Sequence, residues 1–519
     1  MRGTKRNFSL LICALCSCFV IVATAQAAAP VGAFTTKGAY SFRSAPQLHP
    51  PKLHTEGRTK RRSLASGFFF LANFKNLTIN KPMVGEGGPL ILDKNLQPVW
   101  FFPVGKKLLA GDLKLQRYNG KPALSWWQGV ISNVGVTLSG QVVVVDQHYR
   151  TIGKLTAPKA SGWVISEHDV AIQGHTAWVT AYKVVPGQNL MPFGGRPNGT
   201  VTDCAVQQYD LKTGKLLYTW SAMAHIPLTA SESRPAPAAS PKQIPWDAYH
   251  ENSVQLVGNG RFLVSMRNTW AAYLVDIKTG NIVWTLGGKT PSFTAPRAAQ
   301  FHFQHDVEMH RRNVVSVFDD NCCAITGPGK FAPPFGPSRG LVLKLDTTHH
   351  TVKLLRKYVR APKFAAAFLG NAQLLGNGNV MIGWGSQPFF SEYSKRGKLL
   401  IDVRWPGPNL SYRAYVQRWV GKPYFPPSGA VRRRGSKTTV YASWDGATEV
   451  ARWRVLAGSS GKHLKRVATA SKRGFETAIS VSGSFKAFKV QALDRKGHVL
   501  GTSGVFPKKK RSSSGPGFY

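Results

Sequence analysis

Three histidines occupy the same place in a repeated sequence pattern. The copies read EHDVAIQGHTAWVTAY, YHENSVQLVGNGRFLVSMRN, QHDVEMHRRNVVSVFDDN and GNAQLLGNGNVMIGWGS, and their leading residues are His168, His250, His305 and Asn371. Each copy begins with polar residues, runs into an apolar stretch, turns at or near Gly or Asn, and leaves as a second apolar stretch. A neutral imidazole serves as nucleophile or general base, and an imidazolium donates to a leaving oxygen. The pattern therefore predicts a site built from imidazoles.

A purely structural role is the alternative for each histidine. A histidine at the start of a strand often only bonds a neighbouring backbone group or aspartate. By the same reasoning we expect Asp169, Glu251, Asp306 and Asn252 to serve as turn or inter-sheet partners rather than as catalysts. No spacing of metal ligands is present, so we predict neither a metal site nor a bound cofactor.

A second repeat supplies the elements that must position these residues. The copies read LILDKNLQPVWFF, VVVVDQHYRTIGKL, VQQYDLKTGKLLYTW, AYLVDIKTGNIVWTL, LVLKLDTTHHTVKLL and FFSEYSKRGKLLIDV. Five carry an aspartate at the turn, and Tyr393 takes its place in the sixth; the aspartates are Asp93, Asp146, Asp210, Asp276 and Asp346. Such turns between β-branched and aromatic runs favour hairpins. Spacings of 47 to 70 residues match one four-stranded propeller blade with its loops. Six hairpins predict six blades, with the histidines near the central channel.

Composition and length agree with an all-β protein of two domains. The 519 residues include 51 Gly and 33 Pro, and no long segment has helical periodicity. We predict a basic, Pro-rich linker over 28–65, a six-bladed β-propeller over 66–426 and a small fibronectin type III or Ig-like β-sandwich over 430–507. Residues 508–519 form a basic tail that we expect to be disordered.

The N-terminus has the features of a signal peptide over 1–27. Arg2, Lys5 and Arg6 precede an apolar run, and Ala25-Gln26-Ala27 offers a small-residue cleavage site. The alternative is an uncleaved membrane anchor, for which the run is short. No later segment is long and apolar enough to span a bilayer, so we predict a secreted or cell-surface protein.

Two proline-rich insertions interrupt the repeats, and their ranges are 186–247 and 322–337. Long loops of this kind shape binding faces. The second insertion begins with Cys322 and Cys323, and Cys204 is the only other cysteine after the signal segment. In a secreted protein this composition predicts a disulfide from Cys204 to one member of the pair, with one thiol left over.

The net charge is +44, from 68 basic and 24 acidic side chains. Such an excess attracts polyanions, including anionic cell-wall polymers, and anionic substrates. Nucleic acid would bind on charge alone, without specificity. A generally basic surface with no particular partner is the alternative.

Four blocks taken together resemble the arylsulfotransferase family, in its secreted branch with a C-terminal β-sandwich. They are WDAYHENSVQLVGNGRFLVSMRN, FHFQHDVEMH with the following VFDDN, SRGLVLKLD, and FLGNAQLLGNGNVMIGWGSQPFFSEY. The resemblance implies a PAPS-independent aryl sulfotransferase, which moves a sulfuryl group from an aryl sulfate ester to a phenol through a sulfated histidine. By matching motif it implies His250 and His305 as catalytic, with Asn252 and Arg339 as supporting groups that contact the substrate. The alternative for Arg339 is an ion pair at the blade surface. The histidine repeat adds His168 as a further residue that we expect to contact the substrate.

The sequence departs from the family pattern at two places. The characterised enzymes carry the sulfated histidine in the segment corresponding to 368–392, where this chain has Asn371, Gln373, Gln387 and Pro388 but no histidine. The arginine expected soon after the VFDDN block is replaced by the Cys322-Cys323 insertion. Either His250 or His305 takes over as nucleophile, or the chemistry differs, or the protein only binds a ligand.

Two other functions fit parts of the sequence. One is a non-catalytic cell-surface propeller that binds an anionic aromatic or polymeric ligand, with the sandwich as an adhesion module. The other is a quinone-dependent dehydrogenase, because DIKTGNIVW and DLKTGKLLYTW resemble the turns of such propellers. That class usually needs more blades and a regular docking tryptophan in each.

Overall fold

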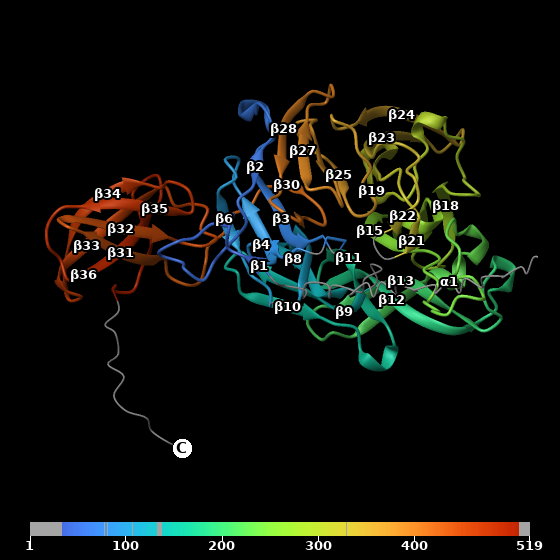
Figure 1. Ribbon diagram of the computed structural model, residues 1–519, viewed down its shortest axis with the longest axis horizontal. Helices are drawn as coiled ribbons and strands as arrows, with labels where there is room; N and C mark the ends of the chain where they lie inside the picture. The colour runs from blue at the N-terminus through green and yellow to red at the C-terminus, as the bar shows by residue number, and fades with distance from the viewer. Residues whose placement is uncertain are drawn as a thin grey trace, which may run out of the picture.

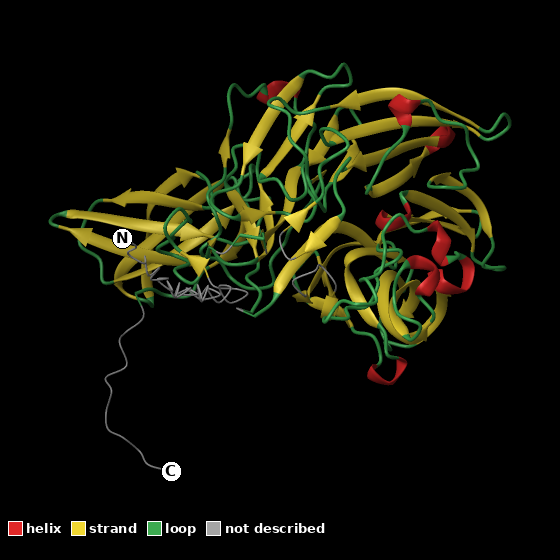
Figure 2. Ribbon diagram, turned by 45° about the vertical axis from the view of Figure 1, so that its right-hand side comes forward, coloured by secondary structure: helices red, strands yellow, loops and turns green. Residues whose placement is uncertain are grey.

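The structure is a computed structural model in which strands make up most of the ordered chain (Figure 2). It describes residues 34–507 except 77, 80, 106, 132–136 and 328–329. The predicted signal peptide over 1–27 and the tail over 508–519 lie outside these residues. Within the described residues the one α-helix is α1 (Ala222–His225), and no helix is long and apolar enough to cross a membrane.

Six antiparallel sheets of four or five strands form the larger part of the molecule (Figure 1). The first along the chain contains β7 (Leu109–Tyr118), β8 (Lys121–Ile131), β9 (Thr137–Asp146) and β10 (Thr151–Leu155). The second contains β11 (Val164–Gln173), β12 (Thr176–Gln188), β13 (Gly199–Asp210) and β14 (Leu216–Ser221). The third contains β15 (Glu251–Gly258), β16 (Arg261–Met266), β17 (Ala271–Asp276) and β18 (Ile282–Gly287).

Of the remaining three sheets, the fifth and sixth include strands from distant parts of the sequence. The fourth sheet contains β19 (His305–His310), β20 (Val314–Asp319), β23 (Arg339–Asp346) and β24 (Thr351–Tyr358). The fifth contains β25 (Asn371–Leu374), β26 (Val380–Gly383), β27 (Phe389–Tyr393), β28 (Leu399–Arg404) and β2 (His54–Thr55). The sixth joins β3 (Phe68–Lys75), β5 (Gly88–Leu92) and β6 (Pro98–Phe101) to the late strands β29 (Asn409–Leu410) and β30 (Tyr415–Gln417). The fold is therefore all-β and propeller-like.

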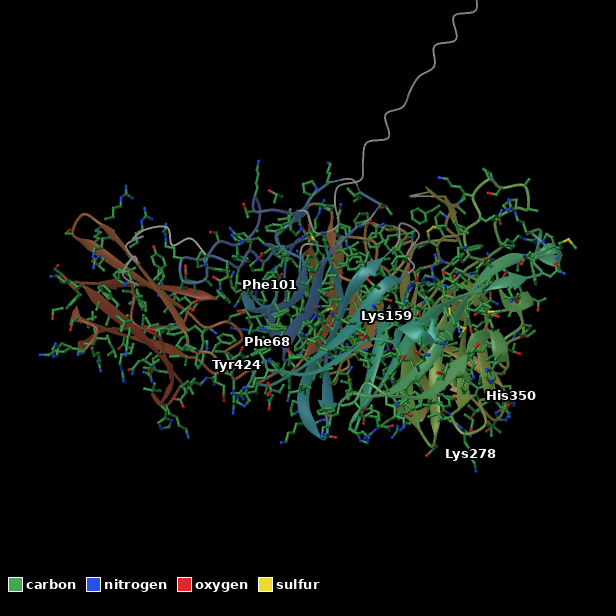
Figure 3. The ribbon with its side chains drawn as sticks, turned by 90° about the horizontal axis from the view of Figure 1, so that it is seen from below. Phe68, Phe101, Lys159, Lys278, His350 and Tyr424 are labelled. Atoms are coloured by element: carbon green, nitrogen blue, oxygen red, sulfur yellow. A yellow bond between two sulfur atoms is a disulfide. The ribbon has the colours of Figure 1, made fainter. Side chains whose placement is uncertain are left out.

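The six predicted hairpins are confirmed, each as a strand pair at one side of a different sheet. The pairs are β5–β6, β9–β10, β13–β14, β17–β18, β23–β24 and β27–β28. Each of the five aspartates caps its turn through Oδ1; for Asp210 the donors are the amides of Lys212 and Thr213, at 3.0 and 2.7 Å. In the sixth hairpin the Ser394 hydroxyl accepts from the amide of Lys398 at 3.0 Å. Figure 3 shows Lys278 and His350, from two such turns, near the same edge of the molecule.

Glutamine side chains join neighbouring sheets at strands β7, β11, β15, β19, β25 and β30. Gln255 bonds both backbone groups of Met309, at 2.7 and 3.0 Å, and Gln373 bonds both of Val416, at 2.8 and 3.3 Å. Gln116 bridges the carbonyl of Val170 and the amide of Ile172 in the same way. These amides satisfy backbone groups where one sheet meets the next, and so hold the sheets in register.

Arg413, in the segment that joins β29 to β30, forms a buried ionic hub. Its guanidinium lies 3.2 Å from Asp112, 3.3 Å from Asp169 and 3.3 Å from Asp306, carboxylates supplied by three different sheets. Lys114 adds a second cation, 3.1 Å from Asp112 and in contact with Asp169. The closing strands of the sixth sheet are thereby tied to three other sheets through charge.

Residues 34–65 are more ordered than the predicted linker. β1 (Phe34–Thr35) pairs with β4 (Met83–Val84), and β2 extends the fifth sheet. Phe42, Leu48 and Leu53 are buried in one apolar cluster with residues of the fifth and sixth sheets. The prediction of a mobile linker is therefore wrong for this segment, because its scattered apolar side chains fill the core.

The last strands form two further sheets, at the left of Figure 1. One contains β31 (Ser428–Arg434), β32 (Lys437–Ser443) and β35 (Glu476–Val481). The other contains β34 (His463–Ser471), β33 (Arg452–Ser460), β36 (Ala487–Leu493) and β37 (Val499–Thr502). Trp453 is fully buried in their shared apolar cluster. Phe475 contacts Phe42 at 4.3 Å, and the amide of Phe101 donates to Asp445, so this part packs on the larger one.

Candidate active site

The three predicted histidines lie on neighbouring sheets. His168 is in β11, His250 directly precedes β15, and His305 begins β19. The rings of His168 and His250 meet edge to face with centroids 4.9 Å apart. His168 and His305 are 2% and 1% exposed, whereas His250 is 9% exposed. Of the three, His250 is therefore the one most open to a small molecule.

His305 uses both ring nitrogens within the protein. Its Nε2 accepts a hydrogen bond from the amide of Leu369 at 3.1 Å, which places the ring proton on Nδ1. That Nδ1–H donates to Asp320 at 2.6 Å. Burial lowers the pKa of His305 well below its usual range, and the nearby positive charge of Arg267 lowers it further, so the ring is neutral. Its lone pair is not available to attack a substrate in this arrangement.

His250 presents the opposite arrangement. Its Nδ1 bonds the carboxylate of Asp247, which fixes the tautomer and leaves the Nε2 lone pair without a partner in the described part of the chain. The Asp247 carbonyl accepts from the Asn268 amide at 2.7 Å and from the Ser233 hydroxyl at 3.1 Å. His250 also has a φ of 55°, a left-handed conformation that is costly for a residue with a Cβ. The geometry suits a nucleophile held by an aspartate.

His168 is enclosed by polar and aromatic side chains. Its Nδ1 lies 3.1 Å from the Ser166 hydroxyl and 3.4 Å from the Tyr182 hydroxyl, and Tyr412 contacts the ring. Burial lowers the pKa of His168 well below its usual range, with the neighbouring His250 as the next cause. A neutral His168 therefore packs against His250 without adding positive charge.

Arg267 supplies the positive charge of the site. It is 4% exposed and donates to the carbonyls of Cys323 and Ala367, at 2.8 and 3.0 Å, and to Asn268 Oδ1 at 2.8 Å. Among the described residues no carboxylate lies within 4.0 Å of its guanidinium. Burial lowers the pKa of Arg267, because removing a charge from water is costly, and the nearby carboxylates of Asp320 and Asp247 oppose this shift.

A cavity of about 430 Å³ adjoins this arginine. Its walls include Arg267, Asn268, Trp246, Phe303 and Asp247, the partner of His250. Part of the wall comes from the loop before β15, within the predicted insertion over 186–247. His250 is not one of the residues that line the cavity and is connected to it through Asp247. A buried cation and two aromatic walls can together hold an aromatic anion.

Arg339, predicted to contact the substrate, is engaged elsewhere. Its Nε donates to Asp319 at 2.7 Å and its Nη2 to the carbonyl of Gln300 at 2.8 Å. Asp319 is the last residue of β20, and Asp320, the partner of His305, follows it outside the strand. Two arginines line the cavity, Arg267 and Arg234. Arg267 lies within the matched block VSMRN, and the sequence analysis singled out neither residue.

Asn252, also predicted to contact the substrate, is fully buried. It donates to the carbonyl of Gln304 at 2.6 Å, and its own carbonyl accepts from Arg413 at 2.7 Å. Its contacts link the third and fourth sheets. Asp247 is the other residue that the sequence analysis missed, although its position three residues before His250 was a usable signal.

The segment over 368–392, which lacks a histidine, uses its amides to bind backbone. Asn371 pairs with both backbone groups of Ala414 at 2.8 Å, and Gln387 donates to Ala365 at 2.7 Å. The described residues contain no group of three or more His, Cys, Asp or Glu side chains arranged for a metal ion.

The cysteine pairing differs from the prediction. Cys322 and Cys323 form a disulfide with each other, and Cys204 is a buried free thiol. Cys204 is in β13 of the second sheet, whereas the pair follows β20 of the fourth, so the sheets keep them apart. The carbonyl of Cys323 instead accepts from Arg267.

Comparisons with known proteins show the family of this chain. The family model described as "Arylsulfotransferase (ASST)" matches residues 114–405, more than half of the chain. No curated protein matches. Similar solved structures include a protein of unknown function from Bacteroides caccae, with 12% identity, a TM-score of 0.38, and coverage of 67% of this chain and 98% of that one. The Dos1 propeller has 10% identity, a TM-score of 0.31, and coverage of 78% and 80%. The family match shows that this chain belongs to the arylsulfotransferase family.

Proposed function

We propose that the protein is a PAPS-independent aryl sulfotransferase that uses His250 to carry the sulfuryl group from an aryl sulfate ester to a phenol. The observation that carries this proposal is the buried Arg267, without a carboxylate partner among the described residues, beside the Asp247–His250 dyad. The Arg267 amide donates to the carbonyl of His250 at 2.8 Å, so the two residues are held together through the backbone. An anionic sulfate ester would form the direct ion pair that no carboxylate of the described residues makes with Arg267.

The reaction has two half-reactions with equal and opposite bond changes. In the first, the Nε2 lone pair of His250 attacks the sulfur, an N–S bond forms, the ester S–O bond breaks, and a phenolate leaves. In the second, the phenolate of the acceptor attacks the same sulfur, and the N–S bond breaks. The leaving phenolate gains a proton and the acceptor phenol loses one, so the enzyme is unchanged after both steps.

The neighbouring groups act on the charges of these steps. Asp247 accepts the Nδ1–H of His250 and stabilises the positive charge that its ring gains when sulfated. Arg267 has N–H groups beyond the three that bond the protein, and these would donate hydrogen bonds to the sulfate oxygens and stabilise their negative charge during transfer. His305 and His168, neutral and buried, shape the site around His250, so the predicted catalytic pair becomes one nucleophile and one positioning residue.

A turnover assay tests the proposal. The chain from residue 28 is mixed with 4-nitrophenyl sulfate and a phenol acceptor, and release of 4-nitrophenol is followed. We expect acceptor-dependent release, loss in His250→Ala, and a mass increase of one sulfuryl group on the peptide that contains His250. His305→Asn, whose side-chain amide supplies both a donor and an acceptor but no nucleophilic ring nitrogen, should keep measurable turnover. A sulfated peptide containing His305 or absence of turnover in the wild type would refute the assignment.

The same proposal includes the finer architecture and location. We propose a six-bladed propeller over 66–426, a fibronectin type III-like sandwich over 430–507, and a secreted or cell-surface protein with a cleaved signal over 1–27. Pairing of β3 with the late strands β29 and β30 supports the first point. Sequencing the N-terminus of the protein recovered from the culture medium tests the last.

A basic sheet face favours a second candidate function, the binding of an anionic cell-wall polymer. Residues 428–507 contain fifteen Lys or Arg and four Asp or Glu. All four acids have partners: Asp445 with Phe101, Glu449 with Lys422, Glu476 with Ser44, and Asp494 with His498. On β33, β34 and β36, by contrast, Arg452, Arg454, Arg466 and Lys489 have no ion pair within the described residues.

Retention on an anionic polymer column at increasing salt tests this second function. The test variant replaces four residues of the sheet face with Gln: Arg452, Arg454, Arg466 and Lys489. The control variant removes the same charge from the hairpins by replacing Lys212, Lys215, Lys278 and Lys353 with Gln. We expect the test variant to elute at a lower salt concentration than the control variant. If both variants lower the eluting salt concentration equally, retention depends on the net charge of the chain and not on this sheet face.

A further inference from the structure

A cluster of aromatic rings extends from Phe303, the one member of the cluster that lines the cavity, to the exposed Phe335. The guanidinium of Arg267 lies 4.5 Å from the ring centroid of Phe303, a cavity wall. Phe303 lies 5.2 Å from Trp270, and Trp270 lies 5.4 Å from Phe335 and 4.8 Å from His302. Phe335 stacks on His302 at 4.6 Å with an interplanar angle of 23°. We call Trp270, His302, Phe303 and Phe335 the aromatic platform.

The outer ring of the aromatic platform is exposed although it is large and apolar. Phe335 is 61% exposed, and Phe303 at the inner end is 4% exposed. Exposed aromatic surface next to a cavity is a common feature of ligand sites, because stacking on a ligand removes it from water. The indole Nε1 of Trp270 is buried without a hydrogen-bond partner among the described residues, which leaves a donor unused at the centre of the platform.

The aromatic platform is already built in the structure. The carbonyl of Asn321 accepts from the amide of Phe335 at 2.9 Å, and the Asn321 side chain lies 3.2 Å from Nδ1 of His302. One residue thus fixes both members of the exposed stack. The loop that carries Phe335 is the insertion over 322–337, which stands where the family pattern expects an arginine.

From this arrangement we propose that the aromatic platform binds the outer ring of aryl groups with two or more rings, and that Phe335 sets this preference. The proposal rests on the proposed function, since it places the sulfate ester at Arg267 and His250. Successive centroids about 5 Å apart extend the wall beyond one phenyl ring held at the arginine. A bicyclic aryl sulfate therefore gains stacking that phenyl sulfate does not reach.

The test compares 2-naphthyl sulfate with phenyl sulfate in the wild type, in Phe335→Ala and in Phe102→Ala. Phe102 is a matched control, because it is also an exposed phenylalanine, 45% exposed, and stacks on Trp100 far along the chain. We expect Phe335→Ala to lower the ratio of the two kcat/KM values about tenfold, through KM, as one lost aromatic contact would. Phe102→Ala should keep the ratio, and both variants should keep the wild-type melting temperature. An unchanged ratio in Phe335→Ala overturns the proposal.

Binding of sulfonates separates this proposal from the transfer reaction. Calorimetry with naphthalene-2-sulfonate and benzenesulfonate needs no turnover. If the wild type prefers the naphthalene compound and Phe335→Ala loses that preference, the aromatic platform is supported even for a protein that transfers nothing. If the two sulfonates bind the wild type equally, the aromatic platform is refuted even when aryl sulfates are turned over.

Discussion

The amide of Leu369 lies 3.1 Å from Nε2 of His305 and donates a hydrogen bond to it. Leu369 belongs to the segment in which the characterised enzymes carry their sulfated histidine and this chain has none. Its amide bonds the Nε2 lone pair of His305, one of the two histidines predicted as catalytic. Of these two, His250, with Nδ1 on Asp247, is the one whose Nε2 has no hydrogen-bond partner among the described residues.

Replacing Asp247 with Asn should reduce kcat with little change in KM. The amide cannot stabilise the charged ring of sulfated His250, and it can favour the wrong tautomer. We expect a loss of about 10²- to 10⁴-fold in 4-nitrophenol release. Glu232→Gln is the control, since Glu232 also lines the cavity but bonds no histidine. Equal kcat values for Asp247→Asn and wild type would remove Asp247 from the mechanism.

Replacing Arg413 with Met should destabilise the fold. The change leaves Asp112, Asp169 and Asp306 with Lys114 as their nearest cation in a fully buried site, and breaking a buried ion pair costs about 3–5 kcal/mol. Urea unfolding measures the effect. Arg418→Met, at an exposed arginine that bonds Ser66, should change the free energy of unfolding by less than about 0.5 kcal/mol. If the two variants lose similar free energies of unfolding, the ionic hub does not stabilise the fold.

Glu167 should make the protein less stable as pH rises. Burial raises its pKa from 4.5 to about 8, so the folded state holds a proton that the unfolded state releases. Stability therefore falls between pH 4.5 and 8, by up to about 1.4 kcal/mol per pH unit for this one group, and levels off above. Glu167→Gln imitates the protonated form and should remove this part of the slope. Burial also raises the pKa values of Asp306 and Glu308, so these two groups maintain part of the pH dependence of stability in the Glu167→Gln variant.

Urea unfolding of wild type and Glu167→Gln at several pH values provides the measurement. The difference between the two free energies of unfolding should change steadily from pH 5 to pH 8. A constant difference would show that Glu167 titrates alike in the folded and unfolded states.

Thiol labelling of the chain from residue 28 should modify no cysteine in the folded protein and one cysteine after unfolding without reduction. Cys204 is buried, so it should react with a maleimide only after unfolding, and reduction should expose Cys322 and Cys323 as well. Mass spectrometry of the labelled peptides measures both states. A Cys204 peptide linked to the 322–323 peptide would support the pairing predicted from sequence instead.

Much of the fold follows from local patterns. The turn aspartates and their apolar flanks predicted six hairpins, because an Asx side chain caps its own backbone wherever the chain lies. The repeat that begins at His168, His250 and His305 predicted strands on neighbouring sheets, because each copy alternates apolar stretches with a turn at or near Gly or Asn. The segment over 34–65 could not be read this way, since its apolar residues follow no period and are ordered by distant partners such as Phe475.

The sequence by itself determined which residue types recur and which strands carry them, because propensity and turn chemistry act over a few residues. Only the tertiary structure decided what each histidine does. Leu369 and Asp320 form hydrogen bonds with the two ring nitrogens of His305, whereas Asp247 bonds one ring nitrogen of His250. Arg267 reaches the site, whereas Arg339 is held by Asp319. These outcomes depend on hydrogen-bond partners up to about 100 residues away, which no local pattern specifies.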